Sequence, residues 1–325
     1  MKKIIFVTSV GGDVACSALR CLMELKEEFR IIGCDINEYV QGKMYIDDFV
    51  ISPRYDNVEI YKNFIQEMCI NYGVSYFLPI GEQEIVIASS MRDFFCEHNI
   101  NLVINNDNLI NIAINKYKTF QFCKEIGIAV PETIRVSDYK KESREKSLWE
   151  GSFPMILKKE SGCGAKGMQH IYTKESLEKL VDEEKYQEGW ILQKEIGNVD
   201  EEYTMGVFSN GEKTEYIAFR RKLGFGSMSI KVETIIDEKL QHIAERISNK
   251  LSLYGSINVQ LRKENGTYYV FEINPRLSST CAFRHLNGFK DTVWWIKLMD
   301  HKLENIDFKP IQGKIGIKVL DEILF

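Results

Sequence analysis

Three oxygen-bearing side chains in the last quarter of the sequence, Gln260, Glu272 and Asn274, have the types and the spacing of a magnesium site. An Asn-Gly pair at 265–266 separates two β-rich runs and predicts a hairpin, because both residues accept the positive φ angles of a tight turn. Side chains alternate along a strand, so Glu272 and Asn274 share one face. Gln260 falls opposite Glu272 if the loop has three residues or the hairpin carries a bulge.

Carboxylate and carboxamide oxygens are hard ligands that suit Mg²⁺, and Mn²⁺ could replace it. Arg276 follows the three oxygen ligands, and a guanidinium beside such a metal is well placed to contact a transferring phosphoryl group. Phe271 and Ile273 alternate with the ligands and are expected on the opposite face. The alternative is an ordinary hairpin with a solvated polar face.

The N-V-Q of 258–260 and the F-E-I-N-P-R of 271–276 resemble the ATP-grasp superfamily, and within it the branch that includes the large chain of carbamoyl phosphate synthetase. The resemblance covers nearly the whole chain. It implies an α/β protein in which a Rossmann-like N-terminal parallel-sheet domain precedes a two-lobed ATP-grasp module with antiparallel sheets. It also implies that ATP and Mg²⁺ bind between the lobes, and that the other substrates are a small-molecule carboxylate and an amine.

The overall composition is that of an ordinary globular protein. The chain has 325 residues, of which 44% are hydrophobic and 27% charged, with a net charge of −5. This length suits two or three lobes, and the negative charge argues against a nucleic-acid partner. No apolar run approaches the length of a membrane span. The eight cysteines are scattered without a C-x-x-C pair, so we expect reduced, buried residues of a cytoplasmic protein. A homodimer stays open.

Strand and helix patterns alternate through the first hundred residues. A buried strand at 3–9, a helix at 13–27 and a strand at 31–35 form a βαβ unit, which predicts a parallel sheet. The turn at Gly11-Gly12 lacks the G-x-G-x-x-G pattern of dinucleotide sites, and Asp13 would repel a pyrophosphate. An NAD site, and with it a dehydrogenase, is therefore disfavoured.

A glycine-rich segment lies between two predicted strands, 153–158 and 168–172. A Rossmann or Walker loop would lead into a helix, and a protein kinase would also carry H-R-D and D-F-G motifs, which are absent from the sequence. A glycine flap between two strands instead covers a triphosphate with backbone N–H groups. The flap residues predicted to contact nucleotide are Gly162, Gly164, Lys166 and Gly167.

The resemblance implies further nucleotide contacts. Lys116 opens a predicted helix and would reach the ATP phosphates, although Asn115 stands where the family usually has Asp. Lys158, at the end of the strand before the flap, would contact phosphate and adenine. The strand at 190–196 leads into a hinge between the lobes, whose adenine contacts would come from Lys194, Glu195 and Ile196. Glu202 matches the family acid that accepts the ribose hydroxyls.

The resemblance also implies catalytic and substrate-binding residues. Arg221 and Lys222 end a strand before a glycine-rich loop, where similar enzymes contact the acyl phosphate or the acceptor; a basic strand end that faces solvent is the alternative. Together with Arg276 they form the predicted catalytic set. Candidate substrate contacts are Glu82, Glu84, residues 278–280 and Arg284. Glu82 and Glu84 equally suit a helix N-terminus without any substrate role.

These features predict three parts: a Rossmann-like domain at 1–112, a small lobe with the glycine flap at 113–193, and a large lobe with the metal and substrate site at 194–325. The resemblance implies a ligase that activates a carboxylate as an acyl phosphate, joins it to an amine, and releases ADP and phosphate. The absence of a Ser-His-Asp or Cys-His arrangement agrees with that chemistry. The alternative is a non-catalytic regulatory module that binds ATP.

Overall fold

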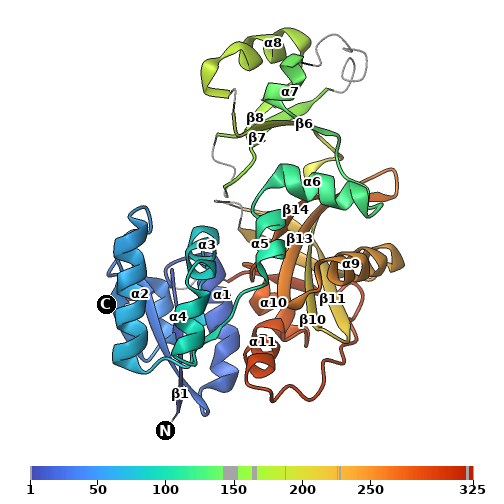
Figure 1. Cartoon of the computed structure of the whole chain (residues 1–325). Coiled ribbons are helices and arrows are strands. Elements are labelled where there is room, and N and C mark those ends of the chain that lie inside the picture. The colour runs from blue at the N-terminus through green and yellow to red at the C-terminus, as the bar shows by residue number, and fades with distance from the viewer. Residues whose placement is uncertain are drawn as a thin grey trace.

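The computed structural model describes residues 2–141, 153–162, 167–186, 188–224, 226, 228–319 and 322–324. These residues form three β-sheets, one parallel and two antiparallel, which confirms the predicted α/β fold. Figure 1 shows the N-terminal sheet and the six-stranded sheet at one end of the molecule and the four-stranded sheet at the other. Within the described ranges, no helix is both long enough and apolar enough to cross a bilayer.

The N-terminal sheet is parallel throughout, with the order β3-β2-β1-β4-β5. Its strands are β1 (Lys3–Val7), β2 (Phe29–Asp35), β3 (Asp48–Ile51), β4 (Tyr76–Leu78) and β5 (Asn101–Leu102). Its helices are α1 (Asp13–Leu22), α2 (Val58–Tyr72), α3 (Glu82–Ser89) and α4 (Arg92–Glu97). Helix α2 illustrates the local signals: the Asn57 side chain accepts a hydrogen bond from the N–H of Ile60, and Gly73 ends the helix with φ 62°.

A side chain of the protein fills the space beside the glycine turn that follows β1. The N–H of Gly11 donates to the carboxylate of Asp35 at 2.8 Å, and a Cβ on Gly11 would lie 2.9 Å from the same carboxylate. Asp35 is the acid at the end of β2, where dinucleotide-binding folds hold the ribose. In this protein the Asp35 carboxylate instead accepts the hydrogen bond from the N–H group of the turn.

The four-stranded sheet is antiparallel, with the order β6-β9-β7-β8. Its strands are β6 (Thr133–Arg135), β7 (Met155–Lys159), β8 (Gln169–Ile171) and β9 (Trp190–Lys194), and its helices are α7 (Val136–Lys141) and α8 (Lys174–Asp182). The pairing of β7 with β8 confirms the predicted strand-loop-strand arrangement around the flap.

The six-stranded sheet has the order β14-β13-β10-β11-β12-β15. Its strands are β10 (Glu202–Asn210), β11 (Thr214–Leu223), β12 (Ser229–Ile235), β13 (Tyr254–Glu264), β14 (Thr267–Asn274) and β15 (Ile315–Ile317). Helix α9 (Glu238–Leu251) packs on one face, and α10 (Cys281–Leu286) and α11 (Asp291–Met299) follow the β13–β14 hairpin. Short 3-10 helices lie at Met23–Leu25, Gln41–Tyr45, Glu184–Tyr186 and Val199–Glu201.

Two helices connect the first sheet to the second, α5 (Asp107–Ala113) and α6 (Lys116–Glu125). Phe122 and Cys123 of α6 are buried in the hydrophobic core shared by α9 and the six-stranded sheet. The boundary predicted at residue 113 assigns α6 to the small lobe, whereas the buried face of α6 packs on the large one.

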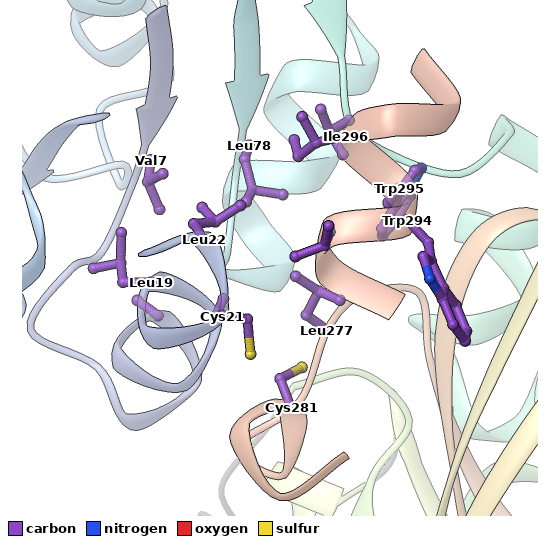
Figure 2. Close-up of a cluster of buried hydrophobic side chains, with 14 of the residues drawn as sticks. Val7, Leu19, Cys21, Leu22, Leu78, Leu277, Cys281, Trp294, Trp295 and Ile296 are labelled. Carbon is purple, nitrogen blue, oxygen red and sulfur yellow. The ribbon is translucent and has the colours of Figure 1, made fainter. Parts of the chain in front are cut away.

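The N-terminal domain and the large lobe share one continuous hydrophobic core. Figure 2 shows Val7, Leu19 and Leu22 from the N-terminal domain near Leu277 and Trp294 from the large lobe. Phe208 and Phe219 extend the same core into the six-stranded sheet. These two parts of the chain therefore support each other by hydrophobic burial.

The described cysteines are all free. Burial fits the expectation at Cys16, Cys21, Cys34, Cys69, Cys123 and Cys281. Cys96, by contrast, is exposed, so the expectation was wrong at that position. It lies in the last turn of α4, on a side of that helix that no other element covers.

Candidate active site

The β13–β14 hairpin brings the three predicted metal ligands to one face. Gln260 pairs with Glu272, and a register shift follows directly after Gln260, so the bulge on which this pairing depended is present. The turn residues Asn265 and Gly266 have φ angles of 49° and 76°, as the Asn-Gly signal predicted. Asn274 lies two residues beyond Glu272 on the same strand.

The bulge also changes the position of Phe271. Leu261 pairs with Val270 and Gln260 with Glu272, so Phe271 is the extra residue of β14. The Lys158 ammonium lies 5.8 Å from the centre of its ring. The expectation that Phe271 points away from the ligand face was wrong, because an extra residue interrupts the two-residue alternation on which it rested.

The chemistry of this face fits a magnesium ion. Among the described residues, no hydrogen bond or ion pair joins the Glu272 carboxylate to another side chain. Asn274 is 1% exposed, and its side-chain nitrogen has no hydrogen-bond partner in the described structure. Turning this amide would present an oxygen at the same place, because the two ends of a carboxamide have nearly the same shape. Gln260 accepts a hydrogen bond from Arg221 at 3.0 Å, which leaves its oxygen a second lone pair.

The site has a single carboxylate among its proposed ligands. No cluster of three or more His, Cys, Asp and Glu side chains suited to a metal occurs in the described part of the chain. Water and substrate phosphate would have to complete the coordination of a Mg²⁺ ion held here. That arrangement is the usual one for magnesium in phosphoryl-transfer sites.

Lys158 lies at the centre of the charged groups between the two lobes. Its ammonium donates to the side-chain oxygen of Gln193 at 2.8 Å. Burial lowers the pKa of Lys158 to about 8, while the Glu272 carboxylate raises it and the positive charges of Lys116 and Arg262 lower it further. These mutual influences show that Lys158, on β7, shares one electrostatic environment with the hairpin of the other sheet.

Lys116 is fixed against the start of the flap. Asn115 caps α6 by accepting hydrogen bonds from the N–H groups of Tyr117 and Lys118, as the sequence predicted. The Lys116 ammonium donates to the carbonyl of Gly162 at 2.6 Å, and its backbone N–H donates to Glu160. Gly162 and Gly167 have φ angles of 114° and 76°, which favour glycine. Gly164 and Lys166 lie outside the described residues.

The predicted hinge residues form the end of the site away from the metal ligands. The backbone N–H of Lys194 donates to the carbonyl of Glu132, and the backbone N–H of Glu195 donates to the carbonyl of Pro154. The Glu195 carboxylate contacts Arg262 at 3.2 Å and the imidazole of His170 at 2.9 Å. Arg262 also donates to the carbonyl of Ile196 at 3.3 Å.

Glu202, the predicted ribose acid, is buried between two arginines. One of its oxygens accepts two N–H groups of Arg221 at 2.8 and 3.2 Å, and the other accepts two N–H groups of Arg262 at 3.3 and 3.4 Å. Arg221 also contacts Gln260, so it links the predicted ribose acid to a predicted metal ligand. Sequence reasoning missed Arg262. The available signal was its position two residues beyond Gln260, which places it on the same face of β13.

The remaining predicted catalytic residues lie in different surroundings. Lys222 is exposed and directly opposite Lys231, on the face of β11 turned away from Arg221, so the structure does not bring it to the ligand face. Arg276 lies two residues beyond the end of β14, and its guanidinium lies 3.2 Å from the Glu82 carboxylate. Glu82 therefore contacts a predicted catalytic residue, Arg276.

Three of the candidate substrate contacts have structural partners instead. Glu84 is buried and accepts hydrogen bonds from Thr8 and Tyr61, both at 2.7 Å, and its carboxylate also accepts the N–H of Gly81 at 2.7 Å at the start of α3. Arg284 has no exposed surface; it donates to Asp291 at 2.8 Å, and Thr280 is likewise fully buried. The expectation that these three residues line an open substrate pocket was wrong, because the packing of α3 and α10 encloses them.

Comparison with known proteins places this site in a family. A family model described as the ATP-grasp domain matches residues 113–280, slightly more than half of the chain. The carbamoyl-phosphate synthase of Methanobrevibacter smithii is 23% identical over 228 residues, which are 66% of this chain and 60% of that protein. The chain therefore spans somewhat more than half the length of this relative.

Solved structures support the same fold. The biotin carboxylase domain of 2-oxoglutarate carboxylase from Hydrogenobacter thermophilus, a dimer in complex with MgADP, ADP and bicarbonate, has a TM-score of 0.75 at 14% identity, covering 97% of this chain and 74% of that one. An L-amino acid ligase from Bacillus licheniformis has a TM-score of 0.71 at 12% identity, covering 95% and 78%.

Proposed function

The chain belongs to the ATP-grasp family, and on that premise we propose that it is an ATP- and Mg²⁺-dependent carboxylate-amine ligase. The proposed reaction activates a carboxylate as an acyl phosphate, joins it to an amine, and releases ADP and phosphate. Small-molecule substrates of this kind are also part of the proposal. A cytoplasmic location and a homodimer stay predictions from the sequence.

One observation carries the proposal: the Glu272 carboxylate has no ion pair among the described residues, and the Lys158 ammonium of the other lobe lies 5.8 Å from the ring centre of its neighbour Phe271. Gln260 and Asn274 lie on the same face, and Arg276 follows at the end of the hairpin. A lone carboxylate with two carboxamides suits Mg²⁺, and the adjacent cations suit a polyphosphate.

The proposed chemistry follows from these groups. A carboxylate reacts poorly with amines because oxide is a poor leaving group, so its oxygen first attacks the γ-phosphorus of ATP and ADP leaves. Lys116, Lys158 and Arg276 would stabilise the negative charge on the transferring phosphoryl group. A Mg²⁺ ion held by Gln260, Glu272 and Asn274 would supply further neutralisation of that charge.

The second step needs little from the protein. The amine attacks the acyl carbon, the bond from that carbon to the phosphate oxygen breaks, and phosphate leaves with the electron pair while the amine loses a proton. Arg276, which follows the proposed metal ligands in the sequence, would hold the acyl phosphate in place for this attack. The names of the structurally similar proteins, which include an amino acid ligase and a bicarbonate-bound carboxylase domain, support the carboxylate as the activated group.

The direct test is ADP release with a panel of carboxylates and amines, with and without Mg²⁺. Amino acids, peptides and sugar acids belong in the panel, as do thiols in place of amines, because an acyl phosphate can also give a thioester. Hydroxylamine, added in parallel reactions, would trap an acyl phosphate as a hydroxamate. Tight ATP binding with neither ADP nor hydroxamate formed from any carboxylate would instead support a regulatory ATP-binding module.

A further inference from the structure

Arg262 occupies a position that the proposed mechanism does not use. It lies on β13, two residues beyond Gln260, with its side chain 16% exposed. Its guanidinium contacts the Glu195 carboxylate at 3.2 Å, the Ile196 carbonyl at 3.3 Å and the Glu202 carboxylate at 3.3 Å. One side chain therefore joins the hinge between the lobes to the acid on β10.

The contacts use two different sides of the guanidinium. Nη1 donates to both hinge groups, Glu195 and Ile196, whereas Nε and Nη2 donate to one oxygen of Glu202. A guanidinium is planar and rigid, so groups bound to its different nitrogens are held at a fixed separation. A lysine could make one of these contacts but could not present the same fork.

The neighbouring charges make Arg262 difficult to replace. Glu202 is almost fully buried, and its other oxygen is held by Arg221 at 2.8 Å. Two N–H groups of Arg262 converge on one oxygen and two N–H groups of Arg221 on the other, so a ribose hydroxyl would bind Glu202 by replacing the longest of these contacts, the one from Arg262 Nε at 3.4 Å. Without Arg262, the carboxylate could turn toward Arg221, and the Ile196 carbonyl would lose its partner.

We propose that Arg262 is the positioning residue of the nucleoside end of the site, and that it makes ATP binding depend on the ribose hydroxyls. By holding the hinge backbone and Glu202 at a fixed separation, it aligns the contacts for base and sugar. This inference rests on the proposed function, because it takes ATP as the ligand that fills the space between the lobes.

The test compares the affinities of ATP, 2′-deoxy-ATP and 3′-deoxy-ATP, each with MgCl₂, by calorimetry on the full chain. The wild type should bind ATP at least about tenfold tighter than one of the deoxynucleotides, because a hydroxyl donating to a buried carboxylate makes a strong hydrogen bond. In Arg262→Met this ratio should fall close to one, and Arg262→Lys should lie between. The matched control is Arg220→Met, since Arg220 pairs with Glu233 on the outer face of β11.

The ratio is measured within the folded protein, so partial unfolding does not change it. Weaker binding by Arg262→Met with an unchanged ratio would show a merely structural role and overturn the inference. A wild type that does not discriminate between ATP and the deoxynucleotides would overturn it too, while ADP release with a carboxylate would leave the ligase proposal standing. If the wild type binds no nucleotide, both proposals fail. Should Arg262→Met not fold, the ratio in Arg262→Lys decides.

Discussion

The guanidinium of Arg276 lies 3.2 Å from the carboxylate of Glu82, across 194 residues of sequence. Arg276 follows the last proposed metal ligand, and Glu82 opens helix α3 of the N-terminal domain. Their side chains are 17% and 11% exposed. The N-terminal domain therefore contributes to the orientation of Arg276, the arginine that we propose to contact the γ-phosphate.

We expect Arg276→Ala to lower kcat by roughly a hundredfold or more while leaving ATP affinity within about tenfold. A group that contacts charge developing in the transition state contributes little to ground-state binding, so its loss appears in kcat. The measurements are ADP formation with hydroxylamine and an independent ATP titration. Arg220→Ala serves as the control. A parallel loss of ATP affinity and kcat would instead assign Arg276 to nucleotide binding.

Glu272→Gln should keep the fold and lose most activity. Removing the single carboxylate among the proposed metal ligands should raise the barrier by about 3 kcal/mol, which is roughly a hundredfold in rate. Titration with Mn²⁺, followed by electron paramagnetic resonance, should show weaker metal binding in the presence of ATP. Glu238→Gln, in the first turn of α9, should behave as the wild type. ADP release at the wild-type rate by Glu272→Gln would remove Glu272 from the metal site.

The affinity for ATP should decrease as pH rises above about 8. The pKa of Lys158 is about 8 in the fold, below its ordinary value of 10.5, so the ammonium that would contact phosphate is lost in this range. Affinity should fall by up to about tenfold per pH unit between pH 8 and 9.5. Lys158→Arg should show no such fall, because arginine stays charged. The same slope in both proteins would assign the titration to another group.

The same pKa predicts an effect of opposite sign on stability. The folded chain binds the Lys158 proton more weakly than the unfolded chain, so this group disfavours folding below pH 8 and ceases to do so as pH rises toward 10.5. At pH 7 the cost is at most about 3 kcal/mol. Lys158→Met should therefore melt at a higher temperature than the wild type at pH 7 while binding ATP poorly. A lower melting temperature would show that the lost contacts outweigh the relieved charge.

Substitution by alanine should affect ATP binding at one glycine and stability at another. Gly162 has a φ angle of 114°, and a Cβ there would contact nothing within 4 Å, so Gly162→Ala should disturb the start of the flap and raise the KM for ATP with little loss of stability. Gly206 is different, since its Cβ would lie 2.5 Å from the enclosed guanidinium of Arg284. Gly206→Ala should cost about 3 kcal/mol of unfolding free energy. Thermal melts and ATP titrations of both variants test the pair; a large loss of stability in Gly162→Ala would make the flap start a structural turn.

The sequence predicts this protein best where local rules decide. The Asn-Gly turn and the alternation of side chains placed Glu272 and Asn274 together, and Gln260 was expected across from Glu272 on condition of a bulge or a three-residue loop. Helix α2 and the parallel N-terminal sheet also follow from apolar patterns and helix caps. The position of Phe271 could not be predicted, because the bulge that moves it depends on how the two strands pair.

The long-range polar contacts lay beyond such rules. Arg262 contacts Glu195 and Glu202 from other strands, and Arg276 contacts Glu82 from another domain. Side-chain types reveal that these residues are charged but not which of them meet, since the register of three strands must be known first. The prediction that Arg284 contacts substrate was wrong for the same reason, because its guanidinium fills the space above Gly206, inside the protein.

The continuous core between the N-terminal domain and the large lobe bears on how such enzymes can be recombined. Ser17 of α1 donates to the carbonyl of Ser279 at 3.0 Å and accepts from the N–H of Ala282 at 2.8 Å, and Leu19 and Leu22 pack beside these contacts. A chimaera that exchanged residues 1–112 alone would cut through this core and separate Glu82 from Arg276. The smallest transplantable unit would instead carry α10 and α11 with the N-terminal domain. A chimaera designed to change the substrate preference would therefore have to exchange these two helices of the large lobe as well.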